Sequence, residues 1–142
     1  MSDDIVVSVD GACSGKRATC AAVLCIGERV VAEKCRTMPG AEGYALAAEI
    51  AGVVLAATLI EGVDAGERPI IIEVDNPVVP RVLRGDYRPP GFRRIPRKLL
   101  EQAEALCWHP HIQFQVLRRN STPGLRRAHR LASTRLWARR RA

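Results

Sequence analysis

Three carboxylates interrupt or end the most apolar segments of this chain. Asp10 and Asp75 each close a β-branched, strand-like run, and Glu49 lies inside the long apolar stretch 45–60. A charged side chain in an apolar segment is costly unless it is paired or binds a metal ion. We therefore expect the three side chains to meet at one shared cation site, and the fold has to bring them together.

The spacing of apolar residues predicts a chain of both strands and helices. Strands are predicted over residues 4–10, 18–26, 29–37, 69–75 and 111–117. Helices are predicted over residues 43–61, after Asn76-Pro77 through Leu83, over 97–107 and over about 124–138, with a turn at 11–17 and a basic loop at 84–96. Three strands in a meander, followed by alternating helices and strands, predict a mixed sheet covered by helices.

Length and composition indicate one globular domain over residues 1–142. The sequence is 47% hydrophobic and 26% charged, which is typical of folded soluble proteins. It has no apolar run of the ~20 residues that cross a bilayer, and Asp3 and Asp4 stand where a signal peptide has basic residues. The five cysteines form no CxxC pair and are expected to be free thiols. We expect a cytoplasmic monomer with no membrane partner.

Charge is divided unevenly along the chain. Residues 1–80 hold 6 Lys/Arg and 12 Asp/Glu, a net charge of −6, whereas residues 81–142 hold 16 Lys/Arg and 3 Asp/Glu, a net charge of +13. An acidic half that can hold cations, joined to a basic half that can hold a polyanion, is typical of an enzyme acting on nucleic acid. The last residues, 138–142, are also consistent with a disordered basic tail.

These residues and their order resemble the ribonuclease H family. The matching pieces are Val9-Asp10-Gly11-Ala12 on the first strand, Glu49 on the first long helix, Asp75-Asn76 after the fourth strand, and the segment 125–132 as the last helix. The resemblance implies a ribonuclease H-like α/β fold with a mixed five-stranded sheet flanked by helices. It also implies an endonuclease that hydrolyses the RNA strand of RNA–DNA hybrids with two Mg²⁺ or Mn²⁺ ions.

The same resemblance implies roles for four residues, as metal ligands and catalytic groups. Asp10 would bridge both ions, Glu49 and Asp75 would complete the shell of one ion, and His129 would serve the other. The family usually has Asp where His129 stands, and no Asp or Glu follows Glu104 to replace it. Imidazole can bind Mn²⁺ and tolerates Mg²⁺ less well, so a measured Mn²⁺ preference would point to His129 as a ligand. The alternative is that His129 is an ordinary helix residue and the second ion is weakly held.

Twelve residues are predicted to contact nucleic acid. Cys13, Ser14 and Asn76 are the candidates for reading 2′-hydroxyl groups, and Arg119 and Arg126 for holding the scissile strand. Seven basic residues are predicted to grip duplex phosphates: Arg81, Arg84, Arg88, Arg93, Arg94, Arg97 and Lys98. The alternative for these seven is a flexible solvated loop.

Four aromatic side chains divide into two predicted groups. Tyr87 and Phe92 lie among the arginines and are candidates for packing on sugars or bases. Trp108 and Trp137 are expected to pack within the protein, and the alternative is that they serve as platforms for bases.

Two departures from the family leave rival functions open. Gly43-Tyr44 stands where many ribonucleases H carry an Asn pair that contacts RNA, and the loop 119–123 lacks the usual His. One rival is a structure-specific DNA nuclease, similar to a junction resolvase, on the same fold. The other is a nucleic-acid-binding relative that has lost catalysis.

Overall fold

The computed structural model describes residues 4–38 and 44–138. Its strands are β1 (Ile5–Ser14), β2 (Arg17–Ile26), β3 (Arg29–Thr37), β4 (Ile70–Val74) and β5 (Ile112–Val116). Its helices are α1 (Ala45–Glu61), α2 (Val78–Leu83), the short 3₁₀ helix η1 (Phe92–Arg94), α3 (Arg97–Cys107) and α4 (Pro123–Leu136). The order of strands and helices predicted from the sequence is confirmed.

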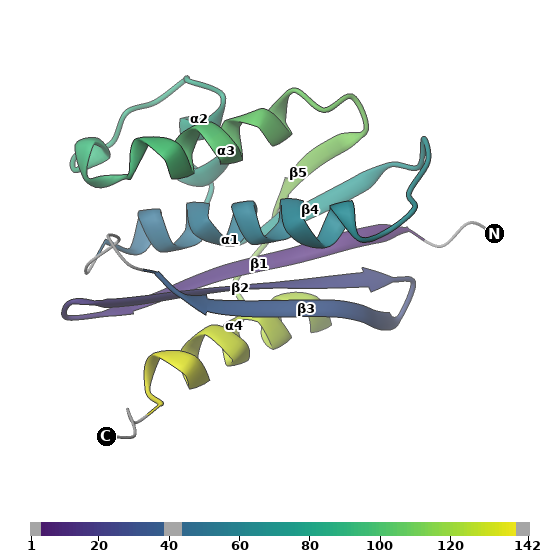
Figure 1. Cartoon of the computed structure of the whole chain (residues 1–142), viewed down its shortest axis with the longest axis horizontal. Coiled ribbons are helices and arrows are strands. Elements are labelled where there is room, and N and C mark those ends of the chain that lie inside the picture. Colours follow the sequence, from purple (N-terminus) through teal and green to yellow (C-terminus); the bar gives the residue numbers. More distant parts are fainter. Residues whose placement is uncertain (1–3, 39–43, 139–142) are drawn as a thin grey trace.

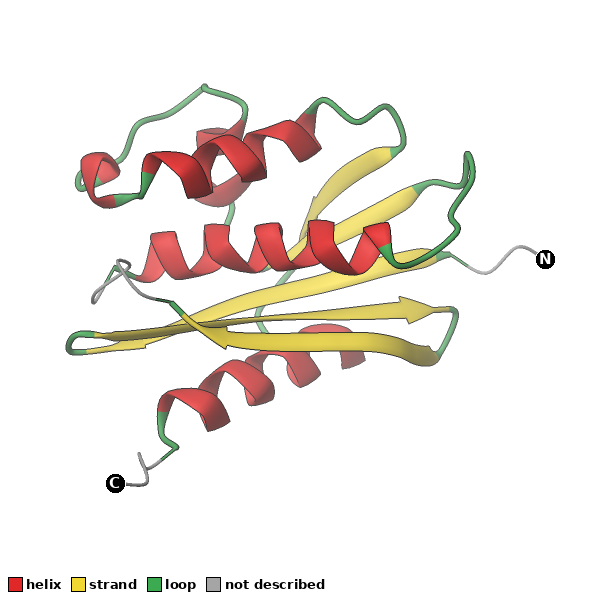
Figure 2. Cartoon of the chain, in the orientation of Figure 1, coloured by secondary structure: helices red, strands yellow, loops and turns green. Residues whose placement is uncertain are grey.

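The five strands form one mixed sheet in the order β3-β2-β1-β4-β5. The first three are antiparallel neighbours, whereas β4 and β5 run parallel to β1. Helices α1, α2 and α3 cover one face of the sheet, and α4 crosses the other face (Figures 1 and 2). This mixed sheet with helices on both faces is the predicted fold class.

The predicted boundaries need three corrections. Residues 11–14 belong to β1 and are not a turn, because antiparallel pairing with β2 continues to the pair Ser14–Arg17. The long helix begins at Ala45, and Gly43, at the start of the predicted helix 43–61, lies outside the described residues. The last helix ends at Leu136, and residues 139–142 of the predicted tail also lie outside the described residues.

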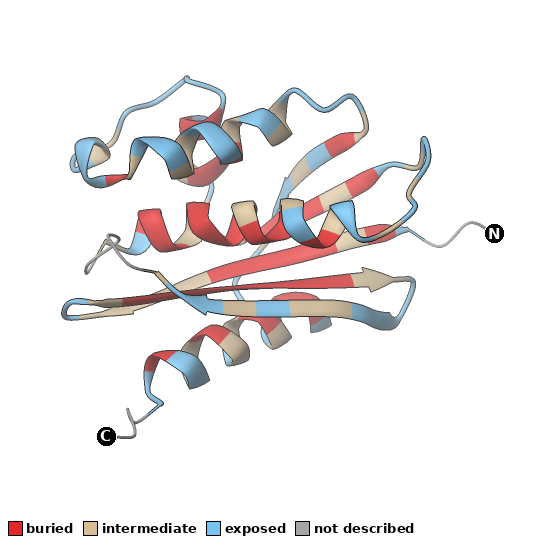
Figure 3. Cartoon of the chain, viewed as in Figure 1, coloured by how far each residue is buried: buried red, intermediate tan, exposed pale blue. Residues whose placement is uncertain are grey.

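Helix α1 is packed between the sheet and α3, so most of its length is buried (Figure 3), and its buried side chains are apolar. Its close approach to β1 depends on Gly11. A Cβ at that position would lie 2.6 Å from the backbone carbonyl carbon of Ala48 and 2.6 Å from the backbone nitrogen of Glu49. The glycine therefore lets the helix backbone lie against the strand beside Asp10, which brings Glu49 close to that carboxylate.

The expectation that both tryptophans pack inside the protein is wrong. Trp108 is 80% exposed and Trp137 is 69% exposed, because both follow the last residue of a surface helix. Cys20 is buried and Cys25 is half-buried, and all five cysteines are free thiols. Among the described residues, no helix combines the length and the apolar character that crossing a bilayer requires.

Candidate active site

The sheet topology brings the three predicted carboxylates together. Strands β1 and β4 are parallel and pair as far as Ser8 and Glu73, so Asp10 and Asp75 each lie two residues beyond that last pair. Glu49 reaches the same place from the second turn of α1. One ligand atom from each of the three carboxylates lies within 4.8 Å of the others. The expected shared acidic site is therefore present.

Because the cluster is partly buried, ionising all three carboxylates without a bound cation costs free energy. Burial is the main cause that raises the pKa of the Asp10 carboxyl, and the charge of Asp75 adds to it, while the hydrogen bond with His129 opposes it. Burial raises the pKa of Glu49 to about 7, against the opposing hydrogen bond from Asn76. Close carboxylates favour either protonation or a bound cation, so the site is suited to attract a metal ion.

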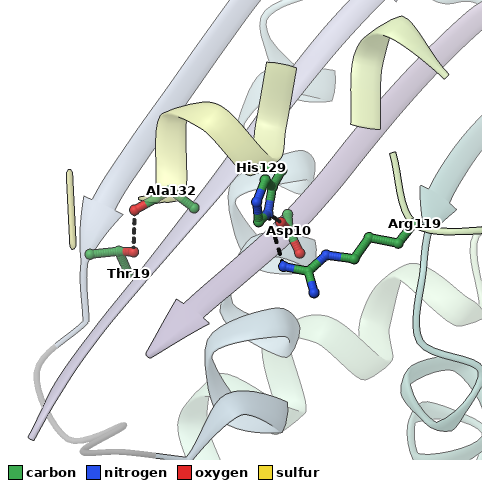
Figure 4. Close-up of polar contacts among 5 residues, drawn as sticks. All are labelled: Asp10, Thr19, Arg119, His129 and Ala132. Carbon is green, nitrogen blue, oxygen red and sulfur yellow. Dashed lines mark hydrogen bonds and ion pairs between the residues drawn. The ribbon is translucent and has the colours of Figure 1, made fainter. Parts of the chain in front are cut away.

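His129 approaches this cluster from α4, which lies on the face of the sheet opposite α1. Its Nδ1 lies 2.9 Å from Oδ2 of Asp10, and Nη2 of Arg119 lies 3.4 Å from the same ring nitrogen (Figure 4). One nitrogen cannot donate to the carboxylate and accept from the guanidinium at the same time. The shorter contact with buried Asp10 is the stronger one, which leaves Arg119 as a positive charge at the rim of the site.

The donor set fits Mg²⁺ or Mn²⁺. Both ions prefer oxygen ligands, and Mg²⁺ sites commonly use few carboxylates and keep several waters. His129 does not belong to the group of three carboxylates whose ligand atoms lie close enough to share an ion, and its 2.9 Å contact with Asp10 is a direct hydrogen bond. Metal binding by His129 therefore stays a prediction.

Solved structures provide an independent comparison. RNase H1 from the halophilic archaeon Halobacterium salinarum superposes with a TM-score of 0.74 at 23% identity, over 94% of this chain and 97% of that chain. The chain has the ribonuclease H fold. The N-terminal RNase H domain of a Mycobacterium tuberculosis protein gives a TM-score of 0.71 at 24% identity, over 95% of this chain and 94% of that chain.

A third similar structure is LC11-RNase H1, a protein isolated from compost by a metagenomic approach. Solved in complex with an RNA/DNA hybrid, it has a TM-score of 0.67 at 17% identity, over 90% of this chain and 93% of that chain. No protein-family model matches the sequence, and a search of curated proteins found no match. The likeness therefore lies in the ribonuclease H fold and not in close sequence identity.

Asn76 has a structural role that the sequence did not indicate. Its Nδ2 donates to Oε2 of Glu49 at 2.8 Å, and its Oδ1 accepts from the backbone N–H of Val78 at 2.9 Å. The amide thus joins the start of α2 to the carboxylate and fixes how Glu49 faces the cluster. A polar residue before Pro77 was the only signal in the sequence. Contact of Asn76 with nucleic acid stays a prediction.

Glu73 is a second residue whose role the sequence did not reveal. It lies in β4, two residues before Asp75. Its Oε1 accepts from the hydroxyl of Ser8 at 2.6 Å and from the hydroxyl of Thr122 at 2.9 Å. Thr122 caps α4 by accepting from the backbone N–H of Leu125. This buried carboxylate therefore fixes the start of the helix that carries His129.

All seven predicted phosphate-binding residues of the segment 81–98 are exposed. Three arginines of this segment lie over aromatic rings: Arg81 over Tyr87 at 4.8 Å, Arg88 over Phe92 at 5.0 Å and Arg94 over Tyr44 at 5.0 Å. The segment also contains η1, so it is partly ordered by its own contacts. Tyr87 and Phe92 are in contact with arginines, and stacking on nucleic acid stays a prediction for them.

The remaining predicted contact residues lie at two other places. Cys13 and Ser14 are half-buried at the end of β1, three and four residues past Asp10. Arg126 is exposed, and its Nη1 donates to the backbone carbonyl of Asn120 at 3.1 Å. Asn120 adopts a left-handed φ of 58° in the turn that follows Arg119. Arg126 therefore helps to hold that turn, and its contact with a scissile strand stays a prediction.

Proposed function

We propose that this protein is a metal-dependent endonuclease that hydrolyses the RNA strand of RNA–DNA hybrids. The observation that carries the proposal is the cluster of Asp10, Glu49 and Asp75, whose ligand atoms lie within 4.8 Å of one another on a ribonuclease H fold. Support for the substrate comes from a protein of the same fold whose structure holds an RNA/DNA hybrid. The net charge of +13 over residues 81–142 fits a polyanionic substrate.

In this proposal, residues of the chain bind the metal ions and orient the groups around them. Asp10, Glu49 and Asp75 would hold the cations, with His129 beside Asp10. Two such ions, when bound, activate a water molecule and stabilise the leaving oxygen. Asn76 keeps Glu49 turned toward the cluster, and Arg119 holds a positive charge at its rim.

The decisive experiment is cleavage of a strand-labelled RNA–DNA hybrid, with Mg²⁺ and Mn²⁺ tested separately. Duplex DNA, duplex RNA and a four-way junction serve as competing substrates. We expect cleavage of the RNA strand that leaves 3′-hydroxyl and 5′-phosphate ends. Asp10→Asn should reduce the rate by more than about 100-fold, because loss of a direct ligand costs more than loss of an outer partner.

Asp86→Asn is the matched control, since it neutralises an exposed carboxylate in the basic segment. It should leave the rate nearly unchanged. Cleavage of the junction without cleavage of the hybrid would replace the proposal with the structure-specific DNA nuclease. Equal rates for Asp10→Asn and the unmodified protein would show that the measured nuclease is a contaminant.

One observation favours a protein that binds nucleic acid without cutting it. Asp10 already has a partner in His129, and Arg119 supplies positive charge nearby, so the carboxylates are partly compensated by the chain itself. His129→Asp separates the two possibilities, because it restores the carboxylate usual in ribonucleases H. In an active enzyme we expect the variant to raise the rate with Mg²⁺ relative to that with Mn²⁺. A chain that stays inactive as His129→Asp, yet binds duplex, is the non-catalytic relative.

A further inference from the structure

We propose that Tyr44 is a positioning residue that fixes the basic segment 81–98 against the start of α1. By doing so it sets where a bound duplex backbone lies relative to the carboxylates. This inference rests on the proposed function, because it concerns the same substrate and the same site.

The contacts of Tyr44 join two parts of the chain that are far apart in sequence. Tyr44 directly precedes α1, and its Oη donates to the backbone carbonyl of Pro90 at 3.1 Å. The guanidinium of Arg94 lies 5.0 Å from the centre of its ring. One side chain thus contacts the basic segment in two ways, once through its hydroxyl and once through its ring face.

The turn in the basic segment is shaped around this ring. Gly91 has a φ of 84°, a left-handed conformation that side chains other than glycine rarely adopt. A Cβ at Gly91 would lie 3.2 Å from Cζ of Tyr44, which is closer than most such contacts. The glycine therefore permits both the turn and the close approach of the backbone to the ring.

The path from Tyr44 to the acidic cluster is short and rigid. Glu49 follows Tyr44 by five residues along α1, which corresponds to about 7.5 Å of helix. Helix α1 is held by buried residues on nearly every side and cannot move without disturbing the core. A segment fixed to the residue that directly precedes this helix is therefore fixed relative to Glu49.

The other two arginine–aromatic pairs do not connect the basic segment to α1. Arg81 over Tyr87 and Arg88 over Phe92 lie wholly within the basic segment, so they order the segment without joining it to α1. Each pair contributes a similar local attraction between a cation and a ring. Tyr87 is therefore a matched control for Tyr44, since each ring carries one arginine and only Tyr44 also precedes the helix of Glu49.

The test compares Tyr44→Ala, Tyr44→Phe and Tyr87→Ala in the full chain. The first measurement is binding of a fluorescent RNA–DNA hybrid in EDTA over a range of salt concentrations. We expect Tyr44→Ala to weaken binding about tenfold and Tyr87→Ala about threefold, since only the first releases the segment from α1. Tyr44→Phe, which keeps the ring and loses the hydroxyl, should lie close to the unmodified protein.

The second measurement maps the cleaved positions on a hybrid of defined sequence with Mn²⁺. Tyr44→Ala should shift or broaden these positions, whereas Tyr87→Ala should lower the rate and leave them in place. Gly91→Ala disturbs the same contact from the other side and should reproduce the Tyr44→Ala pattern, which guards against a variant that merely folds poorly. Equal effects of Tyr44→Ala and Tyr87→Ala on binding and position would overturn the inference.

The two measurements also separate this inference from the proposed function. Binding without cleavage in the unmodified protein would remove the proposed nuclease activity, and the inference would then be decided by the binding of Tyr44→Ala against Tyr87→Ala alone. An unmodified protein that binds no duplex would overturn both.

Discussion

The two faces of the sheet hold their helices by different means. Helix α1 lies on a continuous core of buried apolar residues contributed by β1, β2, β4 and the neighbouring helices. Helix α4 covers a much smaller apolar cluster of four buried residues, Ala21, Val23, Ala128 and Ala132. Around that cluster, α4 is held by side-chain hydrogen bonds to β2, β3 and β4.

This difference separates the acidic cluster from His129. Asp10, Glu49 and Asp75 come from elements of the apolar core, where close packing allows little displacement. His129 comes from α4, whose position is defined by directional contacts such as Thr19 Oγ1 donating to the backbone carbonyl of Ala132 at 2.7 Å. The carboxylates thus form the rigid part of the site, and the orientation of the imidazole depends on a few polar contacts.

The largest expected effect comes from filling the closest contact on the apolar face. Gly11→Ala places a Cβ 2.6 Å from backbone atoms of Ala48 and Glu49, which cannot rotate away. We expect a loss of about 3 kcal/mol in the free energy of unfolding, the upper end for overpacking. Gly124→Ala on the other face meets the side chain of Ser8, whose hydroxyl can move only by giving up its hydrogen bond to Glu73, whereas the backbone atoms at Gly11 cannot move away at all. Urea denaturation should show the smaller loss there, and a larger loss at Gly124 would contradict the comparison.

The next effect is a pH dependence that originates in Glu49. Its pKa of about 7 in the folded chain lies above the ordinary value of 4.5. A carboxyl whose folded pKa is raised contributes stability that is fully present below pH 4.5 and is lost as pH rises through 7. The loss is at most about 3 kcal/mol, and the pKa of Asp10 is shifted in the same direction.

Metal binding should reverse this trend, because a ligand carboxylate must be deprotonated. We therefore expect the melting temperature without metal to fall between about pH 5 and pH 8.5, and the increase caused by Mg²⁺ or Mn²⁺ to grow over the same range. Thermal melts with and without metal check both slopes. Glu49→Gln should flatten them, and slopes that persist in this variant would assign the titration to another group.

Much of the rigid part of the site was predictable from the sequence. Apolar periodicity gives the strands and helices, and the cost of a buried charge singles out Asp10, Glu49 and Asp75. The roles of Asn76 and Tyr44 were not predictable, because they arise from contacts between segments that are 27 and 46 residues apart in sequence. A residue's own type and its neighbours do not indicate which distant segment it will touch.

For the two tryptophans, the sequence led to an expectation that was wrong. Large aromatic side chains are usually buried, yet Trp108 and Trp137 each lie one residue past a helix end and remain largely exposed in the described part of the chain. The sequence indicates the residue type and the helix end, but not what lies opposite that end in the fold.

A smaller effect is expected from the carboxylate that fixes the start of α4. Glu73→Ala would leave the buried hydroxyl of Ser8 without its acceptor and would remove the partner of Thr122. We expect a loss of about 2 kcal/mol in the free energy of unfolding. Glu73→Gln keeps an acceptor oxygen and should lose less, while Glu67→Ala, at an exposed position, should lose almost nothing. If Gln and Ala are equally damaging, the charge of Glu73 matters more than its hydrogen bonds.

The smallest effect is expected from the ion pair at the outer edge of α4. Arg127 contacts both carboxylate oxygens of Glu33 at 2.7 Å, but the two side chains are 43% and 30% exposed. The hydrogen bond from Arg127 lowers the pKa of Glu33, so its contribution is present above pH 4.5 and is lost as pH falls below that value. Solvent and salt screen such a pair strongly.

We therefore expect Glu33→Gln to lower the melting temperature less than Gly11→Ala, Gly124→Ala or Glu73→Ala does, with a deficit that shrinks in high salt. Thermal melts at neutral pH, in low salt and in about 1 M salt, check this. A large loss that persists in high salt would mean that α4 is held mainly from its exposed edge. The orientation of His129 would then depend on Glu33 more than on Glu73, and the hydrogen bonds of buried Glu73 would not be the main contacts that position α4.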